Sequence, residues 1–125
     1  MKNRSISLKR LIKSFGYACN GLRLMFVQEQ NAKLHLSAIL IVVAAGLYFQ
    51  LSAFEWIIVV IVSGSVIAAE AFNTSIEELS NAISPEFDRK IKIVKDFAAS
   101  AVLIASLTSV IVGLIIFMPK IIALF

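Results

Sequence analysis

The sequence predicts an all-α integral membrane protein with three transmembrane helices and an amphipathic surface helix before them. Of its 125 residues, 59% are hydrophobic and 16% are charged. Soluble domains average about 45–50% apolar and about 25% charged residues. Three long apolar runs follow a basic first segment, which is the order expected for helices that cross a bilayer. At this length we expect a single domain covering residues 1–125.

The first segment, about residues 7–28, has the pattern of a basic helix lying in the membrane interface. Its apolar residues recur at helical spacing, and basic residues occupy much of the remaining surface. The apolar set is Leu8, Leu11, Ile12, Phe15, Ala18, Cys19, Leu22 and Phe26, and the basic set is Lys9, Arg10, Lys13 and Arg23. Cys19 is the only cysteine, so an internal disulfide is excluded.

The first and third spans are predicted from uncharged runs. The first, about 32–50, is based on the 21 residues of Leu34–Phe54, and the third, about 91–119, on the 23 residues of Phe97–Pro119. At about 1.5 Å per residue, either run crosses a hydrocarbon core of about 30 Å. His35 is interpreted as an interfacial residue rather than a metal ligand, because it is the only histidine.

The second span, about 54–82, is predicted to carry polar side chains into the bilayer. Only 14 uncharged residues separate Glu55 from Glu70, and a helix of that length is shorter than the hydrocarbon core. The helix must therefore continue through Glu70 and past Asn73 before it leaves the membrane. We expect these side chains to face protein or a water-filled cleft, because lipid offers no hydrogen-bond partner.

The basic residues predict the topology. More than half of the 12 Lys and Arg residues lie at or before Lys33, and most of the others lie in residues 89–95. Such an excess marks the cytoplasmic side. We therefore expect the N-terminus to be cytoplasmic and the C-terminus to lie outside. The clustered acidic and basic residues, all except Glu55 and Lys120, are expected on the cytoplasmic side. Base-stacking aromatics are not interleaved with the basic residues, so no nucleic-acid partner is expected.

Polar residues from three segments are expected at the same membrane depth. They are Glu29, Glu70, Asn73, Glu77, Lys95 and Asp96. Glu70, Asn73 and Glu77 share one helical face, being spaced i, i+3 and i+7. Two carboxylates suit Mg²⁺ bound with substrate phosphates, a lysine stabilises phosphate charge, and a further carboxylate can take a proton from an attacking hydroxyl. The set predicts phosphoryl transfer to a lipid alcohol.

Two other functions fit the same residues. The polar stripe would also suit an assembly subunit, in which it joins the helices of a small oligomer. Alternatively, Glu70 would couple protons or cations in a small membrane transporter. Against transport, the acidic residues crowd one face of the membrane, and none lies near the middle of the first or third span.

Two motifs resemble a known family. E-x-x-N-x-x-I-E occupies residues 70–77, and K-D-x-x-A-x-A-V-L occupies residues 95–103. Together they resemble the small bacterial integral-membrane lipid kinases, the diacylglycerol kinase and undecaprenol kinase family, and the likeness covers almost the whole chain. The resemblance implies a homotrimer in the bacterial inner membrane, with ATP as phosphate donor, Mg²⁺ as cofactor and active sites composed between neighbouring protomers.

The resemblance also implies roles for individual residues. Glu70 would be the general base on the lipid hydroxyl, and Asn73 would orient the site. Glu29 and Glu77 would hold Mg²⁺ with ATP. The other residues expected at the nucleotide are Arg10, Tyr17, Glu86, Asp88, Lys95 and Asp96. The residues expected at the lipid are Arg10, Ser14, Asn31, Glu70 and Ala99.

The chain departs from the family pattern at two positions and shows a preference between the two substrates. Asn81 stands where many members have Asp, and Asp88 stands where many have His. Both changes spare the carboxylates, so any consequence is expected for nucleotide affinity. Undecaprenol is favoured over diacylglycerol, the alternative substrate, by resemblances at His35, at Leu51–Trp56 and at Pro119–Lys120.

Overall fold

The computed structural model describes residues 5–125, and the regular structure of this part is entirely helical. The helices are α1 (Leu8–Gln28), α2 (Gln30–Tyr48), α3 (Ala53–Ile83) and α4 (Arg89–Ile122). The last three are each long and apolar enough to cross a membrane. The prediction of an all-α chain with three candidate spans is therefore confirmed.

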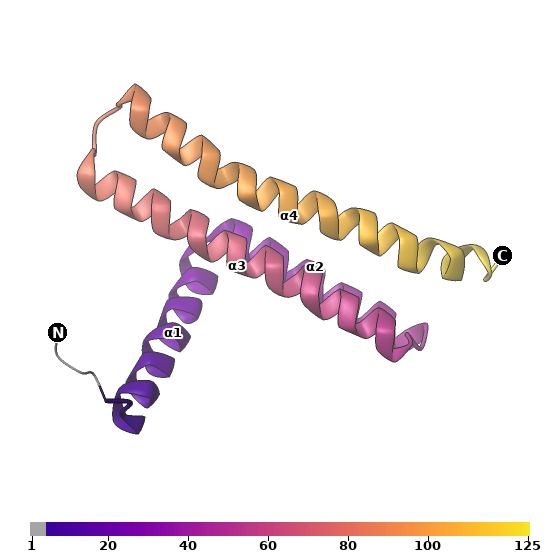
Figure 1. Ribbon diagram of the computed structural model, residues 1–125. Coiled ribbons are helices and arrows are strands. Elements are labelled where there is room, and N and C mark those ends of the chain that lie inside the picture. The colour runs from indigo at the N-terminus through magenta and orange to yellow at the C-terminus, as the bar shows by residue number, and fades with distance from the viewer. Residues whose placement is uncertain (1–4) are drawn as a thin grey trace.

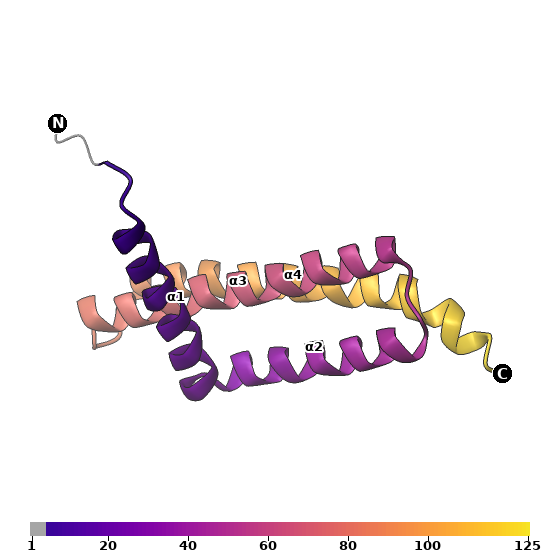
Figure 2. The ribbon, with the colours of Figure 1, turned by 90° about the horizontal axis from the view of Figure 1, so that it is seen from below.

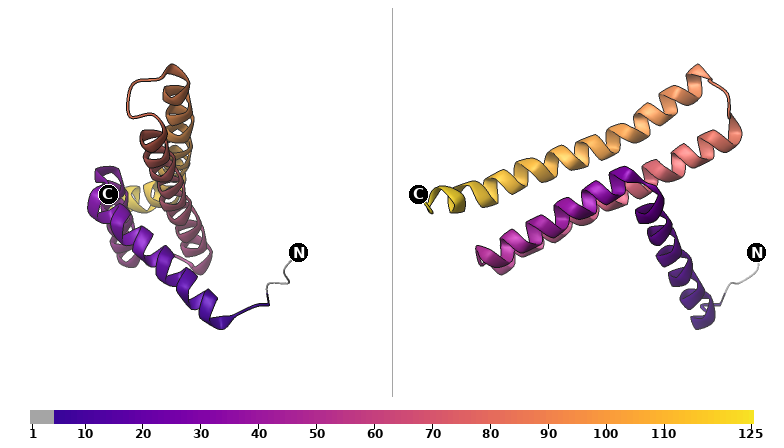
Figure 3. Two further views of the ribbon diagram at one scale, coloured as in Figure 1. Left: turned by 90° about the vertical axis from the view of Figure 1, so that its left-hand side faces the viewer. Right: turned by 180° about the vertical axis from the view of Figure 1, so that it is seen from behind.

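The three candidate spans α2, α3 and α4 run alongside one another, each antiparallel to the next one in the chain, and α1 points away from them at a large angle (Figures 1 and 2). The most extensive packing is between α3 and α4, while α2 packs on α3 and α1 contacts only α2 and α3. The hairpin of α3 and α4 extends beyond the level at which α1 leaves the bundle (Figure 3). The C-terminus lies at the opposite end.

Few side chains are buried within one chain. In the most apolar stretch of each long helix, between 11% and 22% of the residues are buried. Apolar side chains therefore cover the outside of the bundle. Helices with apolar side chains on all sides are those that face lipid or other helices.

The turn between α2 and α3 is tightly built. Ser52 caps α3: its Oγ accepts a hydrogen bond from the Glu55 N–H at 3.2 Å, and Glu55 Oε1 accepts one from the Ser52 N–H at 3.0 Å. This reciprocal arrangement is a capping box. Gly46 lets the Trp56 ring pack closely, because a Cβ at Gly46 would lie 2.6 Å from that ring. The turn is therefore fixed by both hydrogen bonds and packing.

Near the turn between α2 and α3, an ion pair and an apolar cluster connect α4 to the rest of the bundle. Lys120 Nζ lies 3.1 Å from Glu55 Oε2 and so links α4 to α3. Beside it, a cluster of buried apolar residues is formed by Leu51, Val59 and Ile116. This end of the bundle, far from α1, is the closed end.

The last helix begins with a side-chain cap and continues past a proline. Asp88 Oδ1 accepts hydrogen bonds from the backbone N–H groups of Lys90 at 2.8 Å and Ile91 at 3.2 Å. These bonds satisfy two of the free N–H groups at the helix start. Pro119 lies inside the helix, which continues to Ile122.

Candidate active site

Glu70, in the second half of α3, is the only charged side chain that is buried among residues 5–125. Its exposed fraction is 1%, and its Oε2 atom has no hydrogen-bond partner in this part of the chain. Burying a carboxylate without a full set of partners is costly. An ionisable residue in such a position within a span indicates a functional site.

Two further polar residues continue the same face of α3. Asn73, one turn later, is 6% exposed, and its Oδ1 has no partner in the described chain. Glu77, a turn further on, is half-buried. The helix thus presents an amide and two carboxylates along one stripe, as the sequence spacing predicts.

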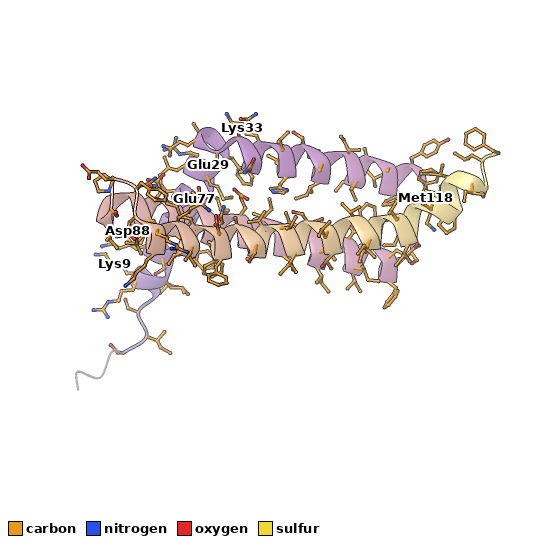
Figure 4. All side chains as sticks on the ribbon, turned by 90° about the horizontal axis from the view of Figure 1, so that it is seen from above. Lys9, Glu29, Lys33, Glu77, Asp88 and Met118 are labelled. Atoms are coloured by element: carbon orange, nitrogen blue, oxygen red, sulfur yellow. The ribbon has the colours of Figure 1, made fainter. Side chains whose placement is uncertain are left out.

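Glu29 joins these carboxylates from a different segment. It is the single residue between α1 and α2, with extended backbone angles (φ −97°, ψ 119°) that turn the chain between the two helices. Glu29 lines a groove together with Ala71 of α3, the residue next to Glu70. Figure 4 shows Glu29 and Glu77 at the same end of the bundle, with Met118 at the other. Glu29 therefore lies beside the segment of α3 that carries the other two predicted carboxylates.

Among the described residues, His35 is the basic group that lies at ion-pair distance from Glu70. Its Nε2 atom lies 3.7 Å from Glu70 Oε2, and its side chain is 22% exposed. This pair was not predicted from the sequence. The signal was present in the antiparallel hairpin of α2 and α3: His35 lies 13 residues before Tyr48, and Glu70 lies 17 residues after Ala53. The two positions therefore differ in height by about one helical turn.

A second polar group lies beyond this level, where α3 meets α4. Lys95 Nζ donates a hydrogen bond to Asn81 Oδ1 at 2.6 Å. Both residues line a cavity of about 180 Å³ together with Glu86 and Asp88. Asp96 lies outside this lining and accepts a hydrogen bond from Lys92 at 2.7 Å. Three of the residues expected at the nucleotide thus surround one hollow.

The residues predicted on α1 do not reach that hollow within one chain. Arg10, Ser14 and Tyr17 are exposed, and Ser14 Oγ donates to the Arg10 carbonyl of its own helix at 3.0 Å. Helix α1 makes no packing contact with α4 in the described part of the chain. The two remaining residues expected at the lipid, Asn31 and Ala99, are also exposed. A single chain therefore carries separated parts of the predicted site.

Glu29 and Glu77, the residues predicted to hold Mg²⁺, carry the type of group that binds this ion together with a nucleotide. Over residues 5–125, no group of three or more His, Cys, Asp or Glu side chains forms a metal site by itself. Neither Glu29 nor Glu77 is engaged in an ion pair in that range. Mg²⁺ commonly binds one or two protein carboxylates, with water and substrate phosphates as its other ligands. Two free carboxylates fit that requirement.

Two hollows lie on this part of the bundle. A groove of about 510 Å³ lies between α1 and α3, and it is lined by small and apolar residues such as Met25 and Ala71 together with the carboxylates Glu29 and Glu78. A cavity of about 160 Å³ lies between α2, α3 and α4, and His35 is its one titratable lining residue. Of the three predicted carboxylates, Glu29 alone lines one of these hollows.

Comparison with known proteins identifies the family. Residues 16–117 match the profile described as Prokaryotic diacylglycerol kinase. The chain is 34% identical over 119 residues to the undecaprenol kinase of Bacillus subtilis, covering 95% of this chain and 97% of that protein.

Two diacylglycerol kinases are also similar. The chain is 30% identical over 115 residues to that of Synechocystis sp., covering 91% of this chain and 66% of that protein. It is 28% identical over 111 residues to that of Escherichia coli, covering 89% and 91%. With three candidate spans and a profile match over most of its length, the chain belongs to the prokaryotic diacylglycerol kinase family of membrane lipid kinases.

Proposed function

We propose that this protein is an undecaprenol kinase, which transfers the γ-phosphoryl group of ATP to the hydroxyl group of undecaprenol. The observation that carries the proposal is Glu70, a carboxylate that is 1% exposed and lacks a hydrogen-bond partner on Oε2 within residues 5–125. The similarity to the Bacillus subtilis undecaprenol kinase, which covers nearly all of both chains, supports the choice of lipid.

Glu70 acts as the general base in this proposal. Its carboxylate takes the proton of the lipid hydroxyl, and the hydroxyl oxygen forms a bond to the γ-phosphorus. The bond between that phosphorus and the bridging oxygen breaks, so that ADP leaves and undecaprenyl phosphate remains. The amide of Asn73, one turn away and also buried, orients the reacting groups.

The nucleotide is held from two sides. Glu29 and Glu77 would hold Mg²⁺, which, when bound, neutralises phosphate charge. Lys95, whose Nζ is held by Asn81 at 2.6 Å, offers positive charge to the phosphates. The remaining residues that we assign to the nucleotide are Arg10, Tyr17, Glu86, Asp88 and Asp96.

The lipid approaches from the bilayer beside α1. We assign Arg10, Ser14, Asn31 and Ala99 to lipid contacts, with Glu70 at the hydroxyl group. The groove between α1 and α3, lined largely by small and apolar residues, supports an apolar substrate at this level. A lipid that is apolar except for its hydroxyl end suits a binding site at the edge of the bilayer.

The active enzyme is proposed to be a homotrimer with sites composed between protomers. Helix α1 carries Arg10 and Tyr17, whereas α4 carries Lys95 and Asp96. The two helices make no packing contact in the described chain. A neighbouring protomer would bring the two sets together. The apolar side chains exposed along α2–α4 offer surface for such contacts.

The proposed location is the bacterial inner membrane, with the N-terminus and the active site in the cytoplasm and the C-terminus outside. The steep angle between α1 and the bundle (Figure 1) suits a helix that lies along the membrane surface. Its basic residues would then meet anionic headgroups.

The test is a direct comparison of substrates. Purified full-length protein in mixed micelles is given γ-labelled ATP, Mg²⁺ and either undecaprenol or diacylglycerol. We expect kcat/KM for undecaprenol to exceed that for diacylglycerol by at least about tenfold. Label in phosphatidic acid alone would make the protein a diacylglycerol kinase, and no labelled lipid from either substrate would contradict the proposal.

A further inference from the structure

We propose that His35 is a positioning residue for phosphoryl transfer, which in its protonated form is the counter-ion of the Glu70 carboxylate. The inference rests on the proposed role of Glu70 as the general base. It begins from one distance, the 3.7 Å between His35 Nε2 and Glu70 Oε2. The ring comes from α2 and the carboxylate from α3, so the contact depends on how the two helices pack.

A counter-ion is needed at this point. Glu70 has to be ionised before it can accept a proton, yet its side chain is only 2% exposed, so water does little to stabilise the charge. Glu77, two turns along the same face of α3, adds further negative charge on this side of the helix. A base built in this way requires a positive group close to it.

His35 is the residue that can supply this charge. Within residues 5–125, it is the only basic side chain at ion-pair distance from Glu70. Lys95 and Lys92 are engaged elsewhere, with Asn81 and Asp96 respectively. From α4, the polar residues that line the cavity next to His35 are serines, which carry no charge. The weakly polar surroundings strengthen the attraction between the ring and the carboxylate.

The distance between the two side chains also indicates that the charge of the His35 ring matters more than its size or its hydrogen bonding. At 3.7 Å the two atoms are too far apart for a good hydrogen bond, so the contact is mainly electrostatic. A neutral side chain of similar size would therefore not replace the ring, whereas a different cation would do so in part. This distinction separates a positioning role from simple packing between α2 and α3.

The experiment measures kcat and the KM for ATP with undecaprenol in mixed micelles for three variants. We expect His35→Ala to lower kcat at least about tenfold and to leave the KM for ATP within about twofold, because ATP is held by other residues. We expect His35→Lys to recover more of the lost kcat than His35→Gln. Ser37→Ala, an exposed position on the same helix, should match the unaltered protein.

A double-variant cycle keeps the test independent of folding effects. If His35 acts through Glu70, adding His35→Ala to Glu70→Gln should lower the residual kcat no further. Recovery by His35→Gln but not by His35→Lys would overturn the inference, as would a change in the KM for ATP alone. Full activity of Glu70→Gln would instead refute the proposed base, so the two failures are distinguishable.

Discussion

Glu55 and Glu70 are two carboxylates of one helix in opposite surroundings. Glu55 Oε1 accepts a hydrogen bond from the Ser52 N–H, and its Oε2 lies 3.1 Å from Lys120 Nζ. Glu70 is 1% exposed, and its Oε2 lacks any hydrogen-bond partner among the described residues. The carboxylate of Glu55 has both oxygens engaged and joins two helices, whereas that of Glu70 is buried with an unpaired oxygen, as expected for the general base that we propose.

The surroundings of the two carboxylates differ in the same way. Around Glu55 lies the closed end, with its capping box and the apolar cluster that includes Leu51 and Val59. Near Glu70 the amide oxygen of Asn73 is also buried without a partner in the described chain, and His35, the residue that contacts Glu70, lines a cavity. The capping box and the apolar cluster, which stabilise the fold, thus lie away from the proposed site at Glu70. This separation is common where function requires polar groups without hydrogen-bond partners.

The largest effect is expected from exchanging each carboxylate for its amide. Glu70→Gln should lower kcat by about 10²–10⁴-fold, the range for loss of a general base. It should lower Tm less than Glu55→Gln does, because Glu70 Oε2 makes no hydrogen bond in the described chain and only the 3.7 Å contact with His35 is lost. Glu55→Gln should keep kcat within about twofold and lower Tm, because it weakens the cap and the Lys120 pair. Initial rates and thermal melting in the same micelles measure both.

The opposite pattern would break the comparison. If Glu70→Gln lost its assembled state on size-exclusion chromatography, the carboxylate would be holding helices together. If Glu55→Gln lost its kinase activity while keeping its Tm, chemistry would lie at the closed end.

A smaller effect is expected at the proposed magnesium ligands. Glu77→Gln should raise the Mg²⁺ concentration for half-maximal activity about 10–100-fold, since one of two carboxylate ligands is lost. Glu78→Gln is the matched control, because Glu78 is adjacent in sequence but exposed, and its Mg²⁺ dependence should be unchanged. Titration of activity with Mg²⁺ at saturating ATP measures both, and equal shifts in the two variants would indicate a general charge effect instead.

The helical content and the stripe on α3 could be predicted from sequence because both depend on local spacing. Uncharged runs predict the spans, and the i, i+3, i+7 positions of Glu70, Asn73 and Glu77 predict one face. Neither inference needs to know how one helix is rotated against another.

The lengths of neighbouring helices indicate which residues lie at similar heights, as for His35 and Glu70, but not which side chains meet. The pairs His35–Glu70, Asn81–Lys95 and Glu55–Lys120 join residues far apart in sequence, and each depends on the rotation and tilt of packed helices. Asn81 was noted as a departure from the family pattern, but only the structure shows that it accepts a hydrogen bond from Lys95. Whether the residues predicted on α1 reach those on α4 depends in addition on how protomers pack together.

The smallest effect is expected from glycine substitutions, which test whether the closed end is as tightly packed as the comparison requires. A Cβ at Gly46 would lie 2.6 Å from Trp56 Cη2 and 3.0 Å from Leu51 Cδ1, whereas a Cβ at Gly113 would meet nothing within 4 Å. Gly46→Ala should therefore cost about 1–3 kcal/mol of unfolding free energy through overpacking, and Gly113→Ala should cost nothing, since alanine favours the helix. Denaturant titration in micelles measures both. Equal stability of the two variants would mean that the turn between α2 and α3 adjusts freely. The end of the bundle around Glu55 would then be no more rigid than the end around Glu70.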